Sequence, residues 1–238
     1  MKKRRQYRGF SLVEVLLAVG TLAVGMIFIS GTFLTGIHFS TISTERTIAA
    51  VVAEEAFAKV RLYGVNLTDP NLAVNRQLPF ESLKLIAGDE FAYPSTKTLT
   101  GKQYYWSALC RPVYSDSANR LVQVTVFISR KMGSSIGYQG GMGRPVPVQV
   151  GLSGAVGDRI LTITGNIQFI NDGYTIVENE TGNIYRVVER GANPAAPEQI
   201  TLAQNKLWQG GDSVWVIPPP IGGGRNPCIG IYQKLISF

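Results

Sequence analysis

The chain has 238 residues, of which 45% are hydrophobic and 16% charged, with a formal net charge of +7. This length is enough for one or two small domains, and one histidine with two cysteines falls short of a four-ligand zinc site. Five basic residues lie within the first eight positions, so most of the net charge belongs to the N-terminus. We therefore do not expect the protein to bind nucleic acid, because such binding requires a basic patch on the folded domain.

An apolar run follows this basic N-terminus. From Val15 to Phe39 the chain contains no Asp, Glu, Lys or Arg, and about 20 apolar helical residues cross the hydrocarbon core of a membrane. The apolar region of a secretory signal peptide is shorter, at about 7–15 residues. Because basic residues favour the cytoplasmic side, we expect a cytoplasmic N-terminus, a membrane span at about 12–38 and a domain outside the cytoplasm.

Glu14 lies at the beginning of this run. A carboxylate in a spanning helix costs free energy and by default indicates a functional site, although a carboxylate at the membrane interface is the simpler alternative. If the chain is cut after Gly9, the new amine of Phe10 lies four positions from Glu14, on the same helical face. A pair of these charges, within one subunit or between neighbours, would give the buried carboxylate the partner that it requires.

The segment Arg8-Gly9-Phe10-Ser11-Leu12-Val13-Glu14, with its basic leader and apolar continuation, resembles the class III leader of type IV pilins and type II secretion pseudopilins. The resemblance implies that a prepilin peptidase removes residues 1–9 and N-methylates Phe10, and that Glu14 aligns an incoming subunit. It implies a single-pass protein of the bacterial inner membrane, with other pilins or pseudopilins and an inner-membrane assembly platform as partners. No enzymatic activity and no cofactor are expected.

The helix is expected to continue beyond the membrane. From Ile42 to Leu62, apolar residues recur at spacings of three, four and seven, which is typical of an amphipathic helix. Gly64 is the expected stop, so residues 10–64 are predicted to form the N-terminal helix. Many major pilins carry a proline near the position of Gly31, and its absence here favours a minor pilin or pseudopilin.

Strand signals follow the helix. The segments Tyr104–Tyr114 and Arg120–Ser129, joined by the turn Ser115–Asn119, predict a β-hairpin within a globular domain at 65–130. A long helix packed on an antiparallel sheet, an α+β fold, is what the pilin resemblance implies. Within the family, the resemblance is closest to I-type minor pseudopilins or V-type minor pilins.

The rest of the chain is expected to be an added all-β module. A Gly-rich linker is predicted at 131–145, and short strand signals separated by turns at 146–238 favour a small barrel or sandwich. The predicted strands are Val146–Val150, Arg159–Thr164, Tyr174–Val177, Ile184–Val188, Ser213–Ile217 and Ile229–Ile236. The pilin resemblance does not account for this module.

Few residues outside the N-terminus suggest chemistry. Cys110 and Cys228 both lie in the exported part, where a disulfide is favoured; two buried free thiols are the alternative. His38 is expected to be an interfacial residue. Calcium ligation by loop oxygens is a minor alternative to solvated turns for three acidic residues, Asp172, Glu178 and Glu180.

The sequence therefore predicts a minor structural subunit of a type II secretion pseudopilus or a type IV pilus. The alternative is a filament-tip binding subunit, for adhesion or DNA uptake, that acts through the C-terminal β module. An exposed aromatic or basic patch would favour that alternative, and the candidate residues for it are Tyr138, Arg144, Trp208, Trp215 and Arg225. No convergent polar site supports a membrane-anchored enzyme.

Overall fold

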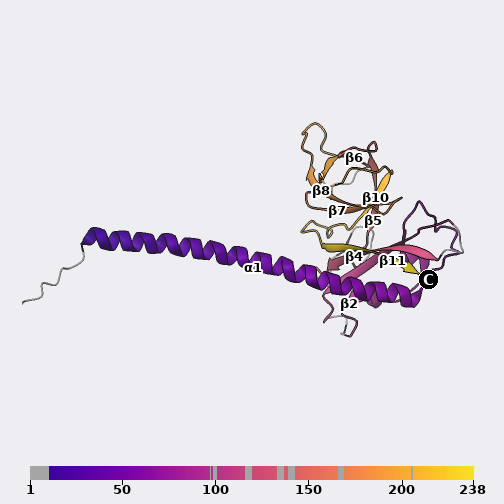
Figure 1. Ribbon diagram of the computed structural model, residues 1–238, viewed down its shortest axis with the longest axis horizontal. Helices are drawn as coiled ribbons and strands as arrows, with labels where there is room; N and C mark the ends of the chain where they lie inside the picture. The colour runs from indigo at the N-terminus through magenta and orange to yellow at the C-terminus, as the bar shows by residue number, and fades with distance from the viewer. Residues whose placement is uncertain are drawn as a thin grey trace, which may run out of the picture. The chain divides into compact units, whose positions relative to one another are not determined.

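The computed structural model describes residues 11–96, 98, 101–115, 120–132, 137–138, 143–165, 169–204 and 206–238. The chain divides into two compact units, Met1–Arg46 and Thr47–Phe238. Secondary structure consists of a long N-terminal helix, a five-stranded antiparallel sheet and a six-stranded closed barrel (Figure 1). This is an α+β fold with an all-β region toward the C-terminus.

Helix α1 runs from Leu12 to Tyr63 and has 52 residues, within the N-terminal helix predicted at 10–64. Gly64 follows it with a φ of 74°, and the Gly64 amide donates a hydrogen bond to the carbonyl of Val60 (3.0 Å). Glycine adopts this left-handed conformation without steric cost. Gly64 is therefore the helix stop that the sequence predicted.

The sheet of the second unit is built mainly from the predicted hairpin. Strands β3 and β4 are antiparallel, with Tyr104 opposite Arg130 and Pro112 opposite Val122. The order of the sheet is β1-β3-β4-β11, and β2 also pairs with β3. The elements of this region are β1 (Leu78–Pro79), α2 (Phe80–Leu83), the 3-10 helix η1 (Gly88–Phe91), β2 (Ala92–Tyr93), β3 (Tyr104–Pro112), β4 (Leu121–Arg130) and β11 (Cys228–Ser237).

One face of this sheet packs on the part of α1 that lies in the second unit. The alternating residues of β4 point to this face and are fully buried: Val122, Val124, Val126 and Ile128. They contact the apolar stripe of the helix, which consists of Ala49, Val52, Ala53, Ala56, Phe57 and Val60. The period of two in the strand and the spacing of three and four in the helix place all these side chains in one core.

The other face of the sheet packs on the barrel. Leu109 of β3 and Phe127 of β4 form a buried cluster with three barrel residues, Val177, Trp215 and Ile217. The junction is reinforced by Gln77, whose side-chain amide donates to the Glu178 carbonyl at 2.7 Å. Both faces of β3 and β4 are thus covered by apolar groups, which explains their long runs of consecutive buried residues.

The barrel closes in the order β10-β5-β6-β9-β8-β7. Apolar side chains fill its interior, where the rings of Tyr185 and Trp208 lie 5.1 Å apart between centroids. The structure selects the barrel from the two predicted architectures. Its strands are β5 (Val148–Ser153), β6 (Ile160–Thr164), β7 (Thr175–Glu178), β8 (Ile184–Arg190), β9 (Gln199–Leu202) and β10 (Ser213–Val216).

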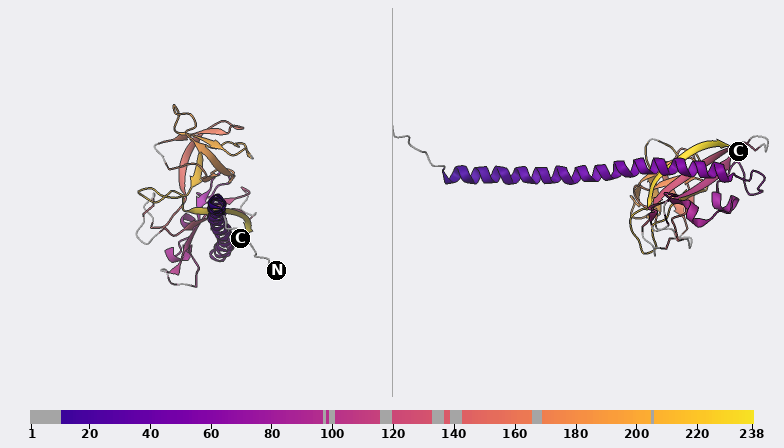
Figure 2. Two further views of the ribbon diagram at one scale, coloured as in Figure 1. Left: turned by 90° about the vertical axis from the view of Figure 1, so that its left-hand side faces the viewer. Right: turned by 90° about the horizontal axis from the view of Figure 1, so that it is seen from below.

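The predicted boundary of the C-terminal module, 146–238, is wrong at its C-terminal end. Strand β11, yellow in Figure 2, pairs with β4 of the first sheet, with Ile236 opposite Val122. The Arg130 amide donates to the carbonyl of Pro227 (2.9 Å), so the chain leaves the sheet and returns to it at adjacent positions. The barrel is therefore an insertion between β4 and β11.

The predicted Gly-rich linker, 131–145, is only partly described, because 133–136 and 139–142 lie outside the described residues. The described part does not have the character of a free linker. Tyr138 is buried and forms an isolated bridge with Pro220, and Arg144 and Pro145 are also buried.

The predicted disulfide between Cys110 and Cys228 is wrong, because both thiols are free. Cys110 pairs with Val124 and Cys228 with Ser129, five positions apart along β4, which corresponds to about 17 Å. Cys110 lies in the core beneath α1, whereas Cys228 packs against the cluster at the barrel junction. A disulfide requires Cα atoms within about 7 Å.

The two thiols should be inert in the native protein. Burial raises the pKa of Cys110 and of Cys228 to about 12, and the thiolate is the reactive form. At pH 8 we expect alkylation by iodoacetamide to be at least about 100-fold slower than for a free thiol. After unfolding in urea without a reductant, two thiols per chain should react. If no thiol reacted after unfolding, Cys110 and Cys228 would be joined by a disulfide, and the free thiols of the structure would be contradicted.

Candidate functional site: the apolar N-terminal helix and Glu14

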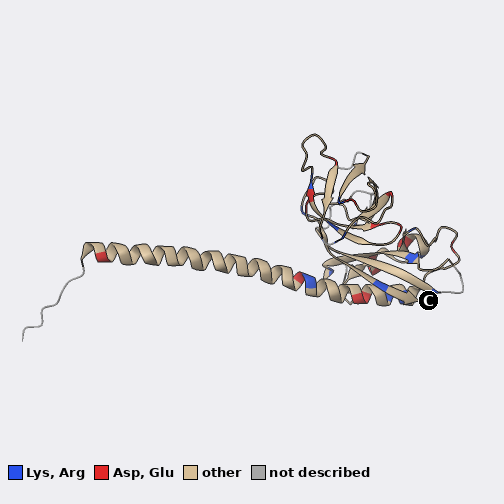
Figure 3. Cartoon of the chain, turned by 45° about the horizontal axis from the view of Figure 1, so that its top comes forward, with Lys and Arg blue, Asp and Glu red and all other residues tan. Residues whose placement is uncertain are grey.

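The first unit consists of helix with no buried residue in its described part, 11–46. Large apolar side chains are exposed on every side, including the consecutive residues Leu12 and Val13 and the run Val15, Leu16 and Leu17. In Figure 3, α1 has an acidic position near its start and then a long uncharged stretch before the next charged positions, and the sequence has no Asp, Glu, Lys or Arg from Val15 to Phe39. Among the described residues, α1 is the one helix that is long and apolar enough to cross a membrane. It is therefore a candidate single membrane span.

Ser11 and Glu14 form the start of this helix. The Ser11 hydroxyl accepts a hydrogen bond from the Glu14 amide at 3.2 Å, and the Ser11 carbonyl accepts from the amides of Glu14 and Val15. Ser11 is thus the N-cap, and Ser-x-x-Glu is the sequence pattern of a capping box, a signal that the sequence analysis missed. A carboxylate in the first turn also interacts favourably with the helix dipole.

The environment of Glu14 leaves its carboxylate available. Glu14 is exposed, and no described cation forms an ion pair with it. The predicted cleavage site, Gly9 and Phe10, lies outside the described residues. The structure therefore defines the helix start at Ser11 and Leu12, and the pairing of Glu14 with a Phe10 amine stays a prediction.

Four glycines interrupt the apolar surface of the first unit, Gly20, Gly25, Gly31 and Gly36. A methyl group added at any of them would meet nothing within 4 Å. Packing within this chain therefore does not require them, although glycine weakens a helix in water by about 1 kcal/mol. Small residues of this kind permit close approach between helices in lipid.

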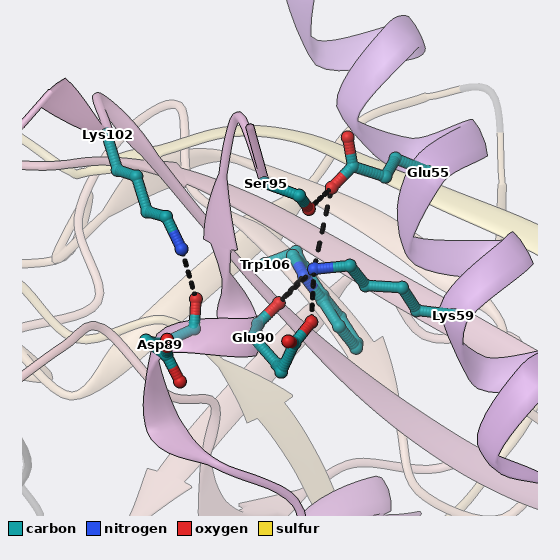
Figure 4. A network of polar contacts seen from close by, with 7 residues as sticks. All are labelled: Glu55, Lys59, Asp89, Glu90, Ser95, Lys102 and Trp106. Atoms are coloured by element: carbon teal, nitrogen blue, oxygen red, sulfur yellow. Dashed lines mark hydrogen bonds and ion pairs between the residues drawn. The ribbon is translucent and has the colours of Figure 1, made fainter. Parts of the chain in front are cut away.

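In the second unit, polar contacts hold α1 to the loop before β3. Lys59 reaches from the helix toward Glu90 of η1, as Figure 4 shows. The Lys59 ammonium donates to the Glu90 carbonyl at 2.7 Å and pairs with the Glu90 carboxylate at 2.8 Å. It also lies 3.5 Å from the Glu55 carboxylate, which accepts a hydrogen bond from Ser95. These contacts fix the helix by charge as well as by apolar packing.

The same loop is fixed to β3, to Lys102 just before it, and to Arg144 in the segment before β5. Trp106 donates from its indole nitrogen to the Glu90 carbonyl at 2.9 Å, and Lys102 donates to the Asp89 carbonyl at 2.8 Å (Figure 4). Arg144 lies 4.0 Å from the ring centroid of Phe91 and forms an ion pair with Glu81. Most of these donors are satisfied by backbone carbonyls, which indicates a structural role.

The acidic residues considered for calcium do not form a site. Glu178 is fully buried, and its carboxylate accepts hydrogen bonds from the Thr181 amide (2.6 Å) and hydroxyl and from the Glu180 amide. Asp172 accepts from the Arg190 amide at 2.9 Å. The described residues contain no group of three His, Cys, Asp or Glu side chains that could hold a metal ion. The expectation of a solvated turn fails for Glu178, because its oxygens are used internally.

The residues considered for a binding patch are mostly internal. Tyr138, Trp208 and Trp215 are buried, as is Arg144, whereas Arg225 is exposed. The indole of Trp215 donates to the Asn179 side chain at 2.8 Å at the barrel junction. These residues therefore do not form the exposed aromatic or basic surface that would favour a filament-tip binding function. His38 is exposed on α1 beside Phe39.

Comparison of the chain with protein-family models, with curated proteins and with solved structures gives no match.

Lys59 offers a test of the polar contacts between α1 and η1. In Lys59→Ala, the partly buried carbonyl and the carboxylate of Glu90 lose a charged partner, so we expect the free energy of unfolding to fall by about 1.5–3 kcal/mol. Urea titration of the full chain in detergent, followed by tryptophan fluorescence, measures this change. The control Arg61→Ala, at an exposed position of the same helix, should change stability by less than about 0.5 kcal/mol. Equal losses of stability in the two variants would contradict a specific role of Lys59 in holding α1 to η1.

Proposed function

We propose that this chain is a minor pilin or pseudopilin, a structural subunit of a type IV pilus or of a type II secretion pseudopilus. A prepilin peptidase would process it, and it would join the filament through its N-terminal helix. The observation that carries the proposal is the helical segment 15–39, which has no charged residue and no buried residue. The motif around Gly9 and the carboxylate of Glu14 supports it further.

An apolar helix of this kind needs an apolar environment in every state of the protein. Each large apolar side chain contributes about 1.5–3 kcal/mol when it is removed from water, so exposure of the whole segment would be prohibitive. Before assembly the lipid supplies this environment, and in a filament the helices of neighbouring subunits supply it. Assembly is then an exchange of apolar surroundings and needs no catalytic group.

Removal of the leader makes this exchange feasible. The leader carries five basic residues, and each cation placed at the centre of a membrane costs about 2.5–3.5 kcal/mol on insertion scales. An uncleaved chain would have to carry these charges through the membrane to leave it. Cleavage after Gly9 removes them and creates one amine at Phe10, close to Glu14.

In this proposal, the charge of Glu14 selects the axial position at which a neighbouring subunit docks. In the membrane its position near the helix start keeps the carboxylate near the interface, where its cost is low. In a dry bundle of helices it requires a cation. The amine of Phe10 on a neighbouring subunit provides that cation only when the two helices are in the correct axial position.

The processed N-terminus is the first test. Protein extracted from membranes of the native host should have the mass of residues 10–238 plus one methyl group, because the cleavage motif is intact. The variant Gly9→Val, in which the peptidase can no longer fit the residue before the cut, should retain Met1 and its basic leader. Mass spectrometry distinguishes the two forms. A wild-type protein that begins with Met1 would exclude processing.

The role of Glu14 is tested by Glu14→Ala and Glu14→Gln. Alanine and glutamine suit lipid at least as well as glutamate, so membrane insertion and cleavage should persist. Assembly should fail, because an unpaired amine in a dry helical core costs about 3–5 kcal/mol. We expect recovery with the other pilins in sheared or purified filaments to fall at least about tenfold at equal expression.

The control for this experiment is Glu45→Ala, which removes a carboxylate from the same helix beyond the apolar run. It should be recovered in filaments at the wild-type level. Equal recovery of Glu14→Ala and the wild type would show that Glu14 is an interfacial residue without a role in assembly.

A further inference from the structure

The two edges of the five-stranded sheet differ in the length of their strands and in their proline content. At the β3 edge the neighbouring strands β1 and β2 have two residues each, and Pro79 and Pro94 lie in or directly after them. Short strands and prolines are devices that prevent further strand pairing. At the other edge, β11 has ten residues and no proline, and no described strand pairs with its outer side.

The register shows which backbone groups of β11 face outward. The Phe238 amide donates to the Arg120 carbonyl at 3.0 Å, and this pairing continues the β11–β4 register, in which Ser237 lies opposite Leu121. In an antiparallel pair, hydrogen-bonded positions alternate with positions whose N–H and C=O groups point away. The outward groups of β11 are therefore those of the odd-numbered residues Gln233, Leu235 and Ser237.

Only the second half of β11 is open. Gln233, Lys234, Leu235 and Ser237 are exposed, and 57% of the surface of Leu235 is accessible. In the first half, residues 228–232 are only partly exposed, and a bulge interrupts the ladder between Cys228 and Gly230. The open edge is thus the segment Gln233–Ser237, about 17 Å long.

We propose that this open edge pairs with the same edge of a second copy of the chain, antiparallel and centred on Leu235. In this register Leu235 faces Leu235, Gln233 faces Ser237, and Lys234 faces Ile236 of the second copy. The three outward-facing residues of each copy then exchange backbone hydrogen bonds. The two exposed leucines cover each other, so one pairing satisfies both the polar edge and its apolar side chain.

Charge and side-chain position select this register. A pairing centred on Lys234 would place two ammonium groups opposite each other, which is destabilising. A pairing centred on Gln233 would place Leu235 opposite Ile231, in the less exposed half of β11. Of these three registers, the one centred on Leu235 places the two exposed leucines opposite each other and keeps the two lysines apart.

The interface is small, since five residues per copy bury far less than the roughly 1,200–2,000 Å² of a stable complex. The association is accordingly weak, and covalent trapping is the suitable measurement. In Leu235→Cys the two new thiols would lie on directly opposed residues, about 5.5 Å apart between Cα atoms, within the range for a disulfide. Cys110 is buried and Cys228 is partly exposed, so the wild type measures the background from the native thiols.

The experiment oxidises the full-length Leu235→Cys protein in detergent with copper phenanthroline, blocks remaining thiols, and separates the products on a non-reducing gel. We expect a reducible dimer at a yield at least about fivefold above that of Leu85→Cys, whose position is 96% exposed but lies in a loop away from β11. Equal yields from the two variants would overturn the proposal, because they would reflect random collision.

A second variant separates pairing from misfolding. Ser237→Pro in the Leu235→Cys background removes an outward N–H that the second copy needs, whereas the bonds of β11 to β4 are made by the even-numbered residues. The sheet should persist, as circular dichroism would show, while dimer yield falls to the Leu85→Cys level. An unchanged yield would overturn the proposal. So would trapping of Leu235→Cys in native membranes to a different protein and not to itself.

Discussion

The structure of the second unit depends on one constraint: the hairpin β3–β4 is apolar on both faces. Val124 and Val126 point to one side and Leu109 and Phe127 to the other, and all four are buried. An antiparallel sheet usually has one face in water, so this hairpin requires two separate covers. The C-terminal part of α1 covers one face, and the barrel covers the other.

This arrangement connects two parts of the second unit through a single element. The part of α1 that lies in the second unit and the barrel both pack on β3 and β4. The junction with the barrel is apolar, with Trp215 and Ile217 at its centre and a buried hydrogen bond from Gln77 beside it. The inserted barrel is therefore a part of the subunit's own core and not a module on a flexible tether.

The sequence predicts local features well and long-range pairing poorly. Helix α1 and the β3–β4 hairpin follow from strong periodicity and from Gly64, and Glu14 stands out because it is alone in an apolar run. The four residues of β9 (Gln199–Leu202) were missed, since so short a segment has little periodic signal.

The strand β11 was expected but its partner was not, because no local pattern specifies pairing with β4. The error over Cys110 and Cys228 has the same origin: both strands were correct, but their faces and register were unknown.

The insertion of the barrel also determines the order in which the protein can fold during synthesis. All barrel strands lie between Val148 and Val216, so the barrel can close as soon as this segment has emerged. The sheet must wait for Cys228–Ser237, and until then β4 presents a bare edge and a core without Ile236. Domains generally fold in the order of their synthesis. Here the five-stranded sheet, whose first strands are synthesised before the barrel, is completed only after the barrel. A nascent chain thus carries an unprotected strand edge for the time needed to make the entire barrel.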